Sequence, residues 1–538
     1  MFYLWRSQLS APTYPGVYLE EIPSGVRTIT GAATSVAAFV GRALRGPVNR
    51  PVTITSFGQF EQHFGGLWLE SSLGYAIADF FVNGGGQAIV VRLFESDAGE
   101  NADTALLIAG EDDNRFEFKA GSPGAWGADL RIRLDAPDAE VSETIAAQYD
   151  LPAHTLFNLR IRDLGTGRQE FHQNLTIVST HARSAQRILE NQSELLRCTA
   201  MPTPREQLAL PFTAELTGTD PWWSEKSSPL VPTTSPSDGV ALKPSSFIGP
   251  GTEANKTGLY SLDRADLFNL LCLPPYAVET WNASTLWQAA ASYCERKRAL
   301  LLVDPNPAWT DSAQVNATSL PISTNAAMFF PSLLQVNPLR ENQVEVFAPC
   351  GAVAGVIART DNTRGIWKAP AGLDATLKGT SGLSVPLTDQ EIGRLNPLGI
   401  NCLRTAPAAG RVVWGARTLR GDDRLASEWK YIPVRRLALY IEETLYRGTQ
   451  WAVFEPNDEP LWAQLRLNIG TFMHGLFRKG AFQGSTPSRA YFVQCDQHTT
   501  TAADAERGIV QIMVGFAPLK PAEFVVIKLQ QIAGQGTA

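Results

Sequence analysis

The sequence has few cysteines and histidines, and neither residue type is clustered. Its six cysteines lie far apart, without a C-x-x-C pair. Disulfide scaffolds and zinc sites need denser or more regularly spaced ligands, so we expect reduced cysteines. The six histidines include no H-E-x-x-H motif and no pair four residues apart. We therefore expect no metal site and no other cofactor.

Long hydrophobic runs and an excess of positive charge are also missing. The longest mildly apolar stretch, TGAATSVAAFVG, is far shorter than the ~20 residues that cross a membrane. The opening MFYLWRSQLS has Arg6 where a signal peptide has its apolar core. The formal net charge of −7 disfavours a nucleic-acid binder, because phosphate binding needs a basic surface. We expect a soluble protein that neither enters a membrane nor binds nucleic acid.

Catalytic motifs are scarce as well. The fragment GPGTEANKTG resembles a phosphate-binding loop, but Asn255 replaces the glycine that must precede the lysine. There is no G-x-S-x-G elbow, and Asp304, after the apolar run Leu300–Val303, is typical of a turn or a helix cap. A Ser-His-Asp arrangement assembled from distant segments stays open, although nothing recommends it. We expect no catalytic residue.

The sequence does contain enough apolar residues for several cores. Its 538 residues, 44% of them hydrophobic, exceed the size of one domain. Strand and helix patterns predict an α/β core, an α+β C-terminal domain, a mostly β inserted domain and extended terminal arms. The expected boundaries are an N-terminal arm at 1–25, a first core part at 26–94, the inserted domain at 95–246, the main α/β core at 247–394, the C-terminal domain at 395–517 and a C-terminal strand arm at 518–538.

Three segments carry helical patterns. SLGYAIADFFVNGG, residues 72–85, is typical of a helix closed by glycine. In the second segment the residues at helical spacing are Leu437, Tyr440, Ile441, Thr444 and Leu445. The third helix is expected to start near Asp458, with Pro460 in its first turn, and to stop at Gly480. Its expected buried stripe is Leu461, Leu465, Ile469, Phe472 and Leu476.

The two ends of the sequence are alike. Residues 521–535, PAEFVVIKLQQIAGQ, are rich in strand formers that Pro518 and Pro521 separate from the preceding domain. Near the start, PTYPGVYLEEI is isolated by prolines and glycines in the same way. An unpaired apolar strand is an aggregation hazard. The C-terminal strand is therefore expected to pair, within its own subunit or with another.

A set of long, specific strings runs through the chain. These are YPGVYLEEI, TGLYSLDRADLFNLLCLP, ARTDNTRGIWKAPAG, LNPLGINCLR, VVWGARTL, YIPVRRLALYIEETL, WAVFEPND and KPAEFVVIKLQQ. Together, and in this order, they resemble the contractile-tail sheath proteins of contractile phages, R-type pyocins and extracellular contractile injection systems. Residues 95–246 match that family least, apart from GSPGAWGADLRIRL.

The resemblance implies a structural subunit rather than an enzyme. The middle domain would have a subtilisin-like fold without a catalytic triad, and the inserted domain would lie outermost. Subunits would form six-membered rings stacked helically around an inner tube, with baseplate and tail-terminator or cap proteins as further partners. The particle, a phage tail or a phage-tail-like assembly, would be built in the bacterial cytoplasm. Its contraction would drive the tube through a target envelope, using packing energy stored at assembly.

The resemblance also assigns roles to residues. Both arms would add strands to a neighbouring subunit, as in β-augmentation. The arm residues expected to form these strands are Tyr14, Val17, Tyr18, Leu19, Phe524, Val525, Val526, Ile527 and Leu529. The C-terminal domain would face the tube, and its candidate contacts are Arg466, Arg478 and Lys479. A basic helix end suits an acidic tube surface, although a solvated helix face would carry the same charges.

Two other functions fit parts of the sequence. A hydrolase would use the α/β core, with the inserted domain as a lid, and would have a coherent polar pocket near Asp304, Thr360 and Asp361. A carbohydrate- or receptor-binding module would use Trp222 and Trp223 of the inserted domain. Such tryptophans more commonly pack against their own domain.

Overall fold

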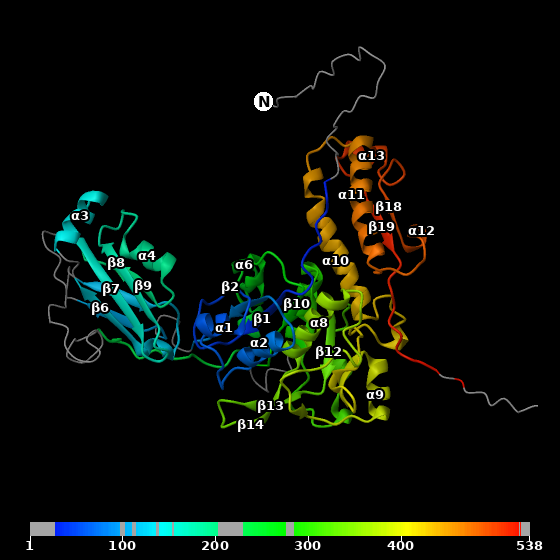
Figure 1. Ribbon diagram of the computed structural model, residues 1–538, viewed down its shortest axis with the longest axis horizontal. Coiled ribbons are helices and arrows are strands. Elements are labelled where there is room, and N and C mark those ends of the chain that lie inside the picture. Colours follow the sequence, from blue (N-terminus) through cyan, green and yellow to red (C-terminus); the bar gives the residue numbers. More distant parts are fainter. Residues whose placement is uncertain are drawn as a thin grey trace, which may run out of the picture. The chain divides into compact units, whose positions relative to one another are not determined.

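The chain forms two compact units (Figure 1). We call Ala33–Glu442 with Lys520–Ala538 the core unit, and Met1–Ala32 with Glu443–Leu519 the terminal unit. Helix α10 (Ile432–Gly448) contributes residues to both. The computed structural model describes residues 27–96, 103–109, 115–135, 139–152, 155–202, 230–275, 284–526 and 528. No helix in these ranges combines the length and hydropathy needed to cross a bilayer.

The core unit is built on an eight-stranded sheet. Its strands in spatial order are β17 (Gly410–Val413), β16 (Ile400–Ala406), β12 (Ala326–Phe330), β11 (Leu300–Val303), β10 (Leu270–Cys272), β1 (Ala37–Gly41), β3 (Ala88–Arg92) and β2 (Pro51–Ile54). The strands from β16 to β3 are parallel, and β17 and β2 close the two edges as antiparallel strands. The central strands are continuous apolar runs, as expected for a parallel sheet buried on both faces.

Helices cover both faces of this sheet. Alternate strand residues point to opposite sides, so Phe39 lies in the apolar layer of α2 (Leu73–Val82) and α8 (Cys350–Arg364), whereas Val40 lies in that of α7 (Ser284–Lys297). The other core helices are α1 (Phe57–Phe64), α5 (Pro244–Ile248), α6 (Thr252–Asn255) and α9 (Asp389–Leu395). The result is an α/β/α sandwich, which agrees with the α/β core that the sequence predicts.

Helices α2 and α8 pack closely through a glycine. A Cβ atom on Gly351 would lie 1.9 Å from the carbonyl oxygen of Ala76, so only glycine fits at this position of α8. Helix α2 itself confirms the helix expected over residues 72–85. Beside this layer, β14 (Gln343–Phe347), β13 (Leu333–Asn337) and β15 (Gly382–Leu383) form a small antiparallel sheet.

The inserted domain follows β3 and consists mainly of two three-stranded sheets, drawn in cyan in Figure 1. One contains β4 (Leu106–Ala109), β5 (Phe116–Ala120) and β9 (Leu196–Ala200), and the other contains β6 (Leu130–Asp135), β7 (Leu156–Asp163) and β8 (Gln169–Thr176). Two helices, α3 (Ala139–Tyr149) and α4 (Ala185–Gln192), complete the domain. Its mostly β character agrees with the alternating sequence pattern.

The terminal unit contains a long helix and a small sheet. Helix α11 (Glu459–Arg478) begins where the sequence predicts, because the Asp458 side chain accepts a hydrogen bond from the Leu461 N–H at 3.3 Å. Of its expected stripe, Phe472 is only half-buried and Met473 is buried instead, since the buried row advances in steps of four residues. The remaining elements are α12 (Pro487–Ala490), β18 (Tyr491–Gln494), α13 (Ala502–Glu506) and β19 (Met513–Phe516).

Strands β16 and β17 pair within the core sheet, although the expected boundary at residue 395 assigns them to the C-terminal domain. Met328 of β12 lies opposite Ile400 of β16. This pairing joins residues about seventy positions apart, and a local pattern does not encode it. The core sheet therefore extends further along the chain than the sequence pattern indicates.

Candidate functional site

The terminal unit presents a sheet of only two strands. β18 and β19 are antiparallel, with Tyr491 opposite Phe516 and Gln494 opposite Met513. Within the described ranges no third strand joins them. A two-stranded sheet is marginal by itself, and each of its edges offers backbone groups for further pairing. This sheet is therefore suited to accept strands from another chain.

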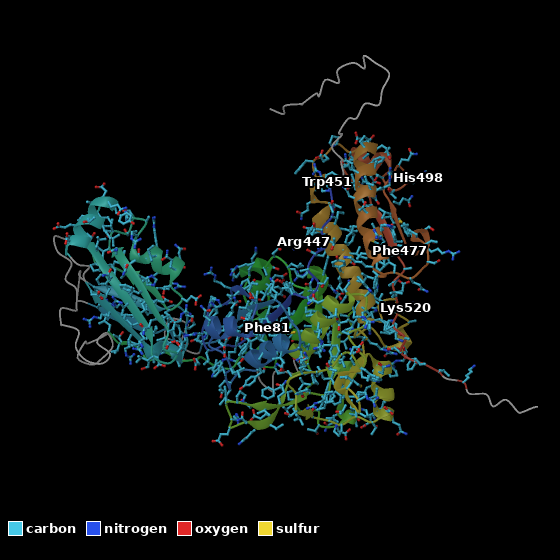
Figure 2. The ribbon with its side chains drawn as sticks, viewed as in Figure 1. Phe81, Arg447, Trp451, Phe477, His498 and Lys520 are labelled. Atoms are coloured by element: carbon cyan, nitrogen blue, oxygen red, sulfur yellow. The ribbon has the colours of Figure 1, made fainter. Side chains whose placement is uncertain are left out.

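The C-terminal arm, residues 518–538, continues from this sheet. Lys520, labelled in Figure 2, is the first arm residue that belongs to the core unit. Phe524, Val525 and Val526 are 76%, 82% and 79% exposed, and none of them is part of a strand. Three consecutive strand formers are thus left in solvent rather than paired in their own subunit.

The other predicted arm residues lie outside the described part of the chain. They are Tyr14, Val17, Tyr18, Leu19, Ile527 and Leu529. The described chain starts at Arg27, whose guanidinium lies 4.5 Å from the centre of the Trp451 ring (Trp451 is labelled in Figure 2). The Arg27 N–H also donates to Asn468 Oδ1 at 3.1 Å. These contacts hold Arg27 against Trp451 and Asn468 within the terminal unit.

A buried charge pair lies at the base of the C-terminal arm. Arg417 donates from Nε and Nη2 to the two carboxylate oxygens of Glu523, at 2.7 and 2.6 Å. Burial alone would raise the pKa of Glu523, but hydrogen bonding and charge attraction from Arg417, aided by Lys430, hold that pKa below its usual value. Glu523 is therefore ionised at neutral pH.

The three basic candidates for a tube contact differ. Arg466 is paired with Glu459 at 2.6 Å and also donates to the Cys495 carbonyl, so its charge is used within the terminal unit. Arg478 and Lys479 are exposed at the end of α11 and form no ion pair with any described residue. A helix C-terminus favours such cations electrostatically, and their charges remain available to a partner.

The polar residues that a hydrolase would use are engaged in structural bonds. Asp304 accepts from the Cys350 N–H at 2.8 Å, at the start of α8, and burial raises its pKa to about 7. Thr360 donates to the Val356 carbonyl at 2.8 Å. Asp361 accepts from Arg436 at 2.7 and 2.6 Å, and both side chains are buried. Asp304 thus binds a backbone N–H in the first turn of α8 from a distant segment, whereas the N-cap residue of that helix is Pro349.

A cavity of about 330 Å³ lies elsewhere in the core unit. Its lining residues are Ala33, Val36, Pro51, Thr53, Gln87, Ile89, Arg264, Ala265, Asp266 and Leu267. It contains none of the three residues that the hydrolase hypothesis names. In the described part of the chain, no cluster of His, Cys, Asp and Glu side chains has a metal-binding arrangement. Trp222 and Trp223 lie outside that part.

Sequence reasoning did not find the Arg417–Glu523 pair. Both residues lie in strings that carry the family resemblance, VVWGARTL and KPAEFVVIKLQQ. They are 106 positions apart, and nothing in either string indicates its partner. Buried charged residues are nearly always paired, but the sequence alone does not show that Arg417 is buried.

Comparisons with known proteins agree on one family. The model for the phage tail sheath protein central domain matches residues 257–419, and the model for the phage tail sheath C-terminal domain matches residues 426–532, together half of the chain. The tail sheath protein of Vibrio phage KVP40 is 25% identical over 178 residues, which are 33% of this chain and 25% of the phage protein. The tail sheath protein of Enterobacteria phage T4 is 26% identical over 168 residues, 31% of this chain and 24% of that protein. The chain thus spans about a quarter of these two relatives.

Solved structures share the fold over almost the whole chain. The sheath tail protein of Listeria innocua has a TM-score of 0.58 at 12% identity, covering 91% of this chain and 96% of that one. The PVC sheath complex of an extracellular contractile injection system, in its contracted state, has a TM-score of 0.56 at 20% identity, covering 97% and 99%. The anti-feeding prophage baseplate has a TM-score of 0.55 at 22% identity, covering 97% and 100%.

Proposed function

Because the chain belongs to the family of contractile tail sheath proteins, we propose that it is a structural sheath subunit that polymerises helically around an inner tube. Six-membered rings of subunits would stack along the tube, bounded by baseplate and tail-terminator or cap proteins. The assembly would form in the bacterial cytoplasm and be part of a phage tail or a phage-tail-like particle. Its contraction would drive the tube through a target envelope.

The observation that carries this proposal is that the subunit has a sheet that can accept a strand and an arm that can donate one, and the two are not paired with each other. The two-stranded sheet β18–β19 lacks further described strands, and Phe524–Val526 are strand formers left in solvent. Strand donation between identical subunits pairs the backbone of both without a large preformed interface. Repeated head-to-tail contact of this kind generates an open helix rather than a closed dimer, which suits a sheath.

Contraction would then be a change of packing between linked subunits. The donated strands keep neighbours connected while their domains rotate and slide into a second arrangement. Two discrete packings with different interface energies store free energy at assembly and release it once triggered. No catalytic step or nucleotide is required of this chain. A non-catalytic, subtilisin-like middle domain would serve as the rigid body, and the inserted domain would face outwards.

The tube contact would use the basic end of α11. Arg478 and Lys479 are exposed and carry unused positive charge, whereas Arg466 is already paired. Reversing both residues to glutamate should block assembly on purified tubes at low salt, because like charges would then face each other. The matched control is Arg489→Glu, a reversal at an exposed arginine of α12. Equal assembly of the double variant and the control would remove this contact from the proposal.

Removing the arm tests the function as a whole. A chain that ends at Leu519 should remain folded, because the described helices and strands all lie upstream, although it should be less stable because Arg417 loses Glu523. It should fail to polymerise, since each subunit keeps its acceptor sheet but lacks the donor. Electron microscopy of the full chain should show striated tubes or rings, and of the truncated chain only single particles. Tubes formed by the truncated chain would contradict strand donation.

A further inference from the structure

The Arg417 side chain lies at the centre of a dense polar cluster in the core unit. The side chain is fully buried, and its guanidinium group contacts Glu523 through two hydrogen bonds. Nη1 donates to the Asn396 carbonyl at 3.0 Å, to Asp423 Oδ1 at 3.1 Å and to the Gly421 carbonyl at 3.3 Å. A planar guanidinium held on all sides presents a fixed fork, which is the geometry that binds a carboxylate through two bonds.

The carboxylate of Glu523 binds this fork, and the exposure of the arm to solvent changes sharply after this residue. Its side chain is 16% exposed, and it also accepts a hydrogen bond from the Tyr431 hydroxyl at 3.2 Å. The Lys430 Nζ atom lies 3.7 Å from the same carboxylate. The next residue, Phe524, is 76% exposed. The arm is therefore held firmly at Glu523 and is exposed to solvent at Phe524, Val525 and Val526.

Arg417 is in turn bonded to the second and third strands from one edge of the core sheet, β16 and β12, through Asn401. Its backbone N–H donates to Asn401 Oδ1 at 2.6 Å, and its carbonyl accepts from Asn401 Nδ2 at 2.8 Å. Asn401 belongs to β16 and is fully buried, and its Nδ2 also donates to the Met328 carbonyl of β12 at 3.0 Å. A continuous chain of hydrogen bonds thus joins Glu523 to two neighbouring strands of the sheet.

We propose that the Arg417–Glu523 pair anchors the base of the C-terminal arm to the core sheet, so that tension on the donated strand passes into β16 and β12. This inference rests on the proposed function, because it assumes that the strand beyond Glu523 is donated. The arm then moves with the core unit, although the residues just before it belong to the terminal unit. Arg417 and Glu523 are positioning residues, since neither belongs to the donated strand itself.

A charged anchor has two physical advantages over an apolar one. A two-bond carboxylate contact fixes both the position and the direction in which the chain leaves, which lowers the ordering cost when a neighbour binds the strand. Breaking it leaves a buried charge without its partner, so partial release under tension is unfavourable. An apolar contact at the same place is non-directional and would fix neither the position nor the direction of the chain.

A spin label on the arm measures the anchor in the full-length monomer. The six native cysteines are buried or half-buried, and burial raises the pKa of Cys198 to about 12, so a Val525→Cys thiol is the selective target. Glu523→Gln should make the label move freely, whereas Lys528→Gln, a neutralisation of an exposed arm lysine, should not. Without the label, Glu523→Gln should raise the lowest concentration that polymerises by about tenfold. The thermal unfolding midpoint of the monomer should fall as well, because buried Arg417 loses one charged partner and keeps only Asp423.

A second variant covers the possibility that Glu523→Gln disturbs folding. Arg417→Lys keeps the positive charge but loses the planar fork, so label motion and polymerisation should change in the same direction by a smaller amount. Equal label motion and equal polymerisation in wild type and Glu523→Gln would overturn the anchor while leaving strand donation intact. Polymerisation of the chain that ends at Leu519 would instead overturn the proposed function. The two failures are therefore distinguishable.

Discussion

The sheets of the two units differ in how they satisfy their own backbone groups. The core sheet has eight strands, helices on both faces and short antiparallel strands at its edges. The sheet of the terminal unit has two described strands and is flanked by a single long helix, α11, and short elements. A sheet of the first kind is stable within one chain, whereas one of the second kind gains stability from added strands. In the proposed assembly the terminal unit would supply the acceptor sheet, and the arm of the core unit would supply the donor strand.

The largest expected effect comes from breaking the buried ion pair of the core unit. Asp361→Ala leaves Arg436 buried without its partner, because the two side chains are only 2% and 3% exposed. We expect a loss of about 3–5 kcal/mol in the free energy of unfolding of the core unit, measured by urea denaturation of the monomer. The control is Asp374→Ala, which breaks the exposed pair with Arg364 and should change little. Equal effects would mean that burial does not distinguish these pairs.

A second test concerns the pH dependence of the core unit. Burial raises the pKa of Asp79 to about 7, despite two hydrogen bonds of 2.8 Å from Gln335 Nε2. A folded pKa above the unfolded one means that the folded state binds the extra proton, so stability falls as pH rises from about 4 to 7. The free energy of unfolding that this carboxyl group costs over that pH range is at most roughly 4 kcal/mol.

The substitution Asp79→Asn should remove this pH-dependent loss and make the core unit more stable than the wild type at pH 8. Urea denaturation at several pH values measures it. An unchanged slope would mean that other groups, with Asp304 the first to examine, cause the dependence. The pH dependence of the Arg417–Glu523 contact has the opposite sign. The pKa of Glu523 is lowered in the folded state, so the contact weakens as pH falls.

A smaller effect is expected in the terminal unit. Leu465 is 1% exposed and packs with Leu461 and Cys495. Leu465→Ala should cost about 2–3 kcal/mol, and hydrogen exchange should show reduced protection in α11 but not in β11. Leu467→Ala, at a 51% exposed leucine of the same helix, is the control. Loss of protection in both elements would mean that the two units unfold together.

The smallest effect on stability should accompany a complete loss of assembly. Val526 is 79% exposed, so Val526→Pro should change the free energy of unfolding of the monomer by less than about 0.5 kcal/mol. Proline removes a backbone donor from the strand, and polymerisation should stop. Val526→Thr keeps both the N–H group and the branched side chain, and it should still polymerise. Tubes formed by the proline variant would show that Val526 is not paired in the assembly.

Local sequence signals predicted helices and strands well where the buried residues recur at the regular spacing of a helix or form one continuous apolar run. The run Leu300–Val303 is a strand with those same bounds, and α11 starts next to Asp458 as expected. The prediction was less accurate where packing decides which of two adjacent apolar residues is buried. In α11, for example, Met473 is buried in place of Phe472. It did not extend to pairs distant in sequence. Asp361 was considered for catalysis, whereas the structure engages it with Arg436.

The sequence alone therefore determined where the buried strand Leu300–Val303 and the helices α2 and α11 lie, because hydrophobic period, capping and turn residues act over a few positions. The tertiary structure decided that β16 lies beside β12, that Asp361 meets Arg436 and that Glu523 meets Arg417. Such partners depend on strand order and on the exclusion of water from the assembled core. A charged residue in the sequence looks the same whether it will be solvated or buried against a partner 106 positions away.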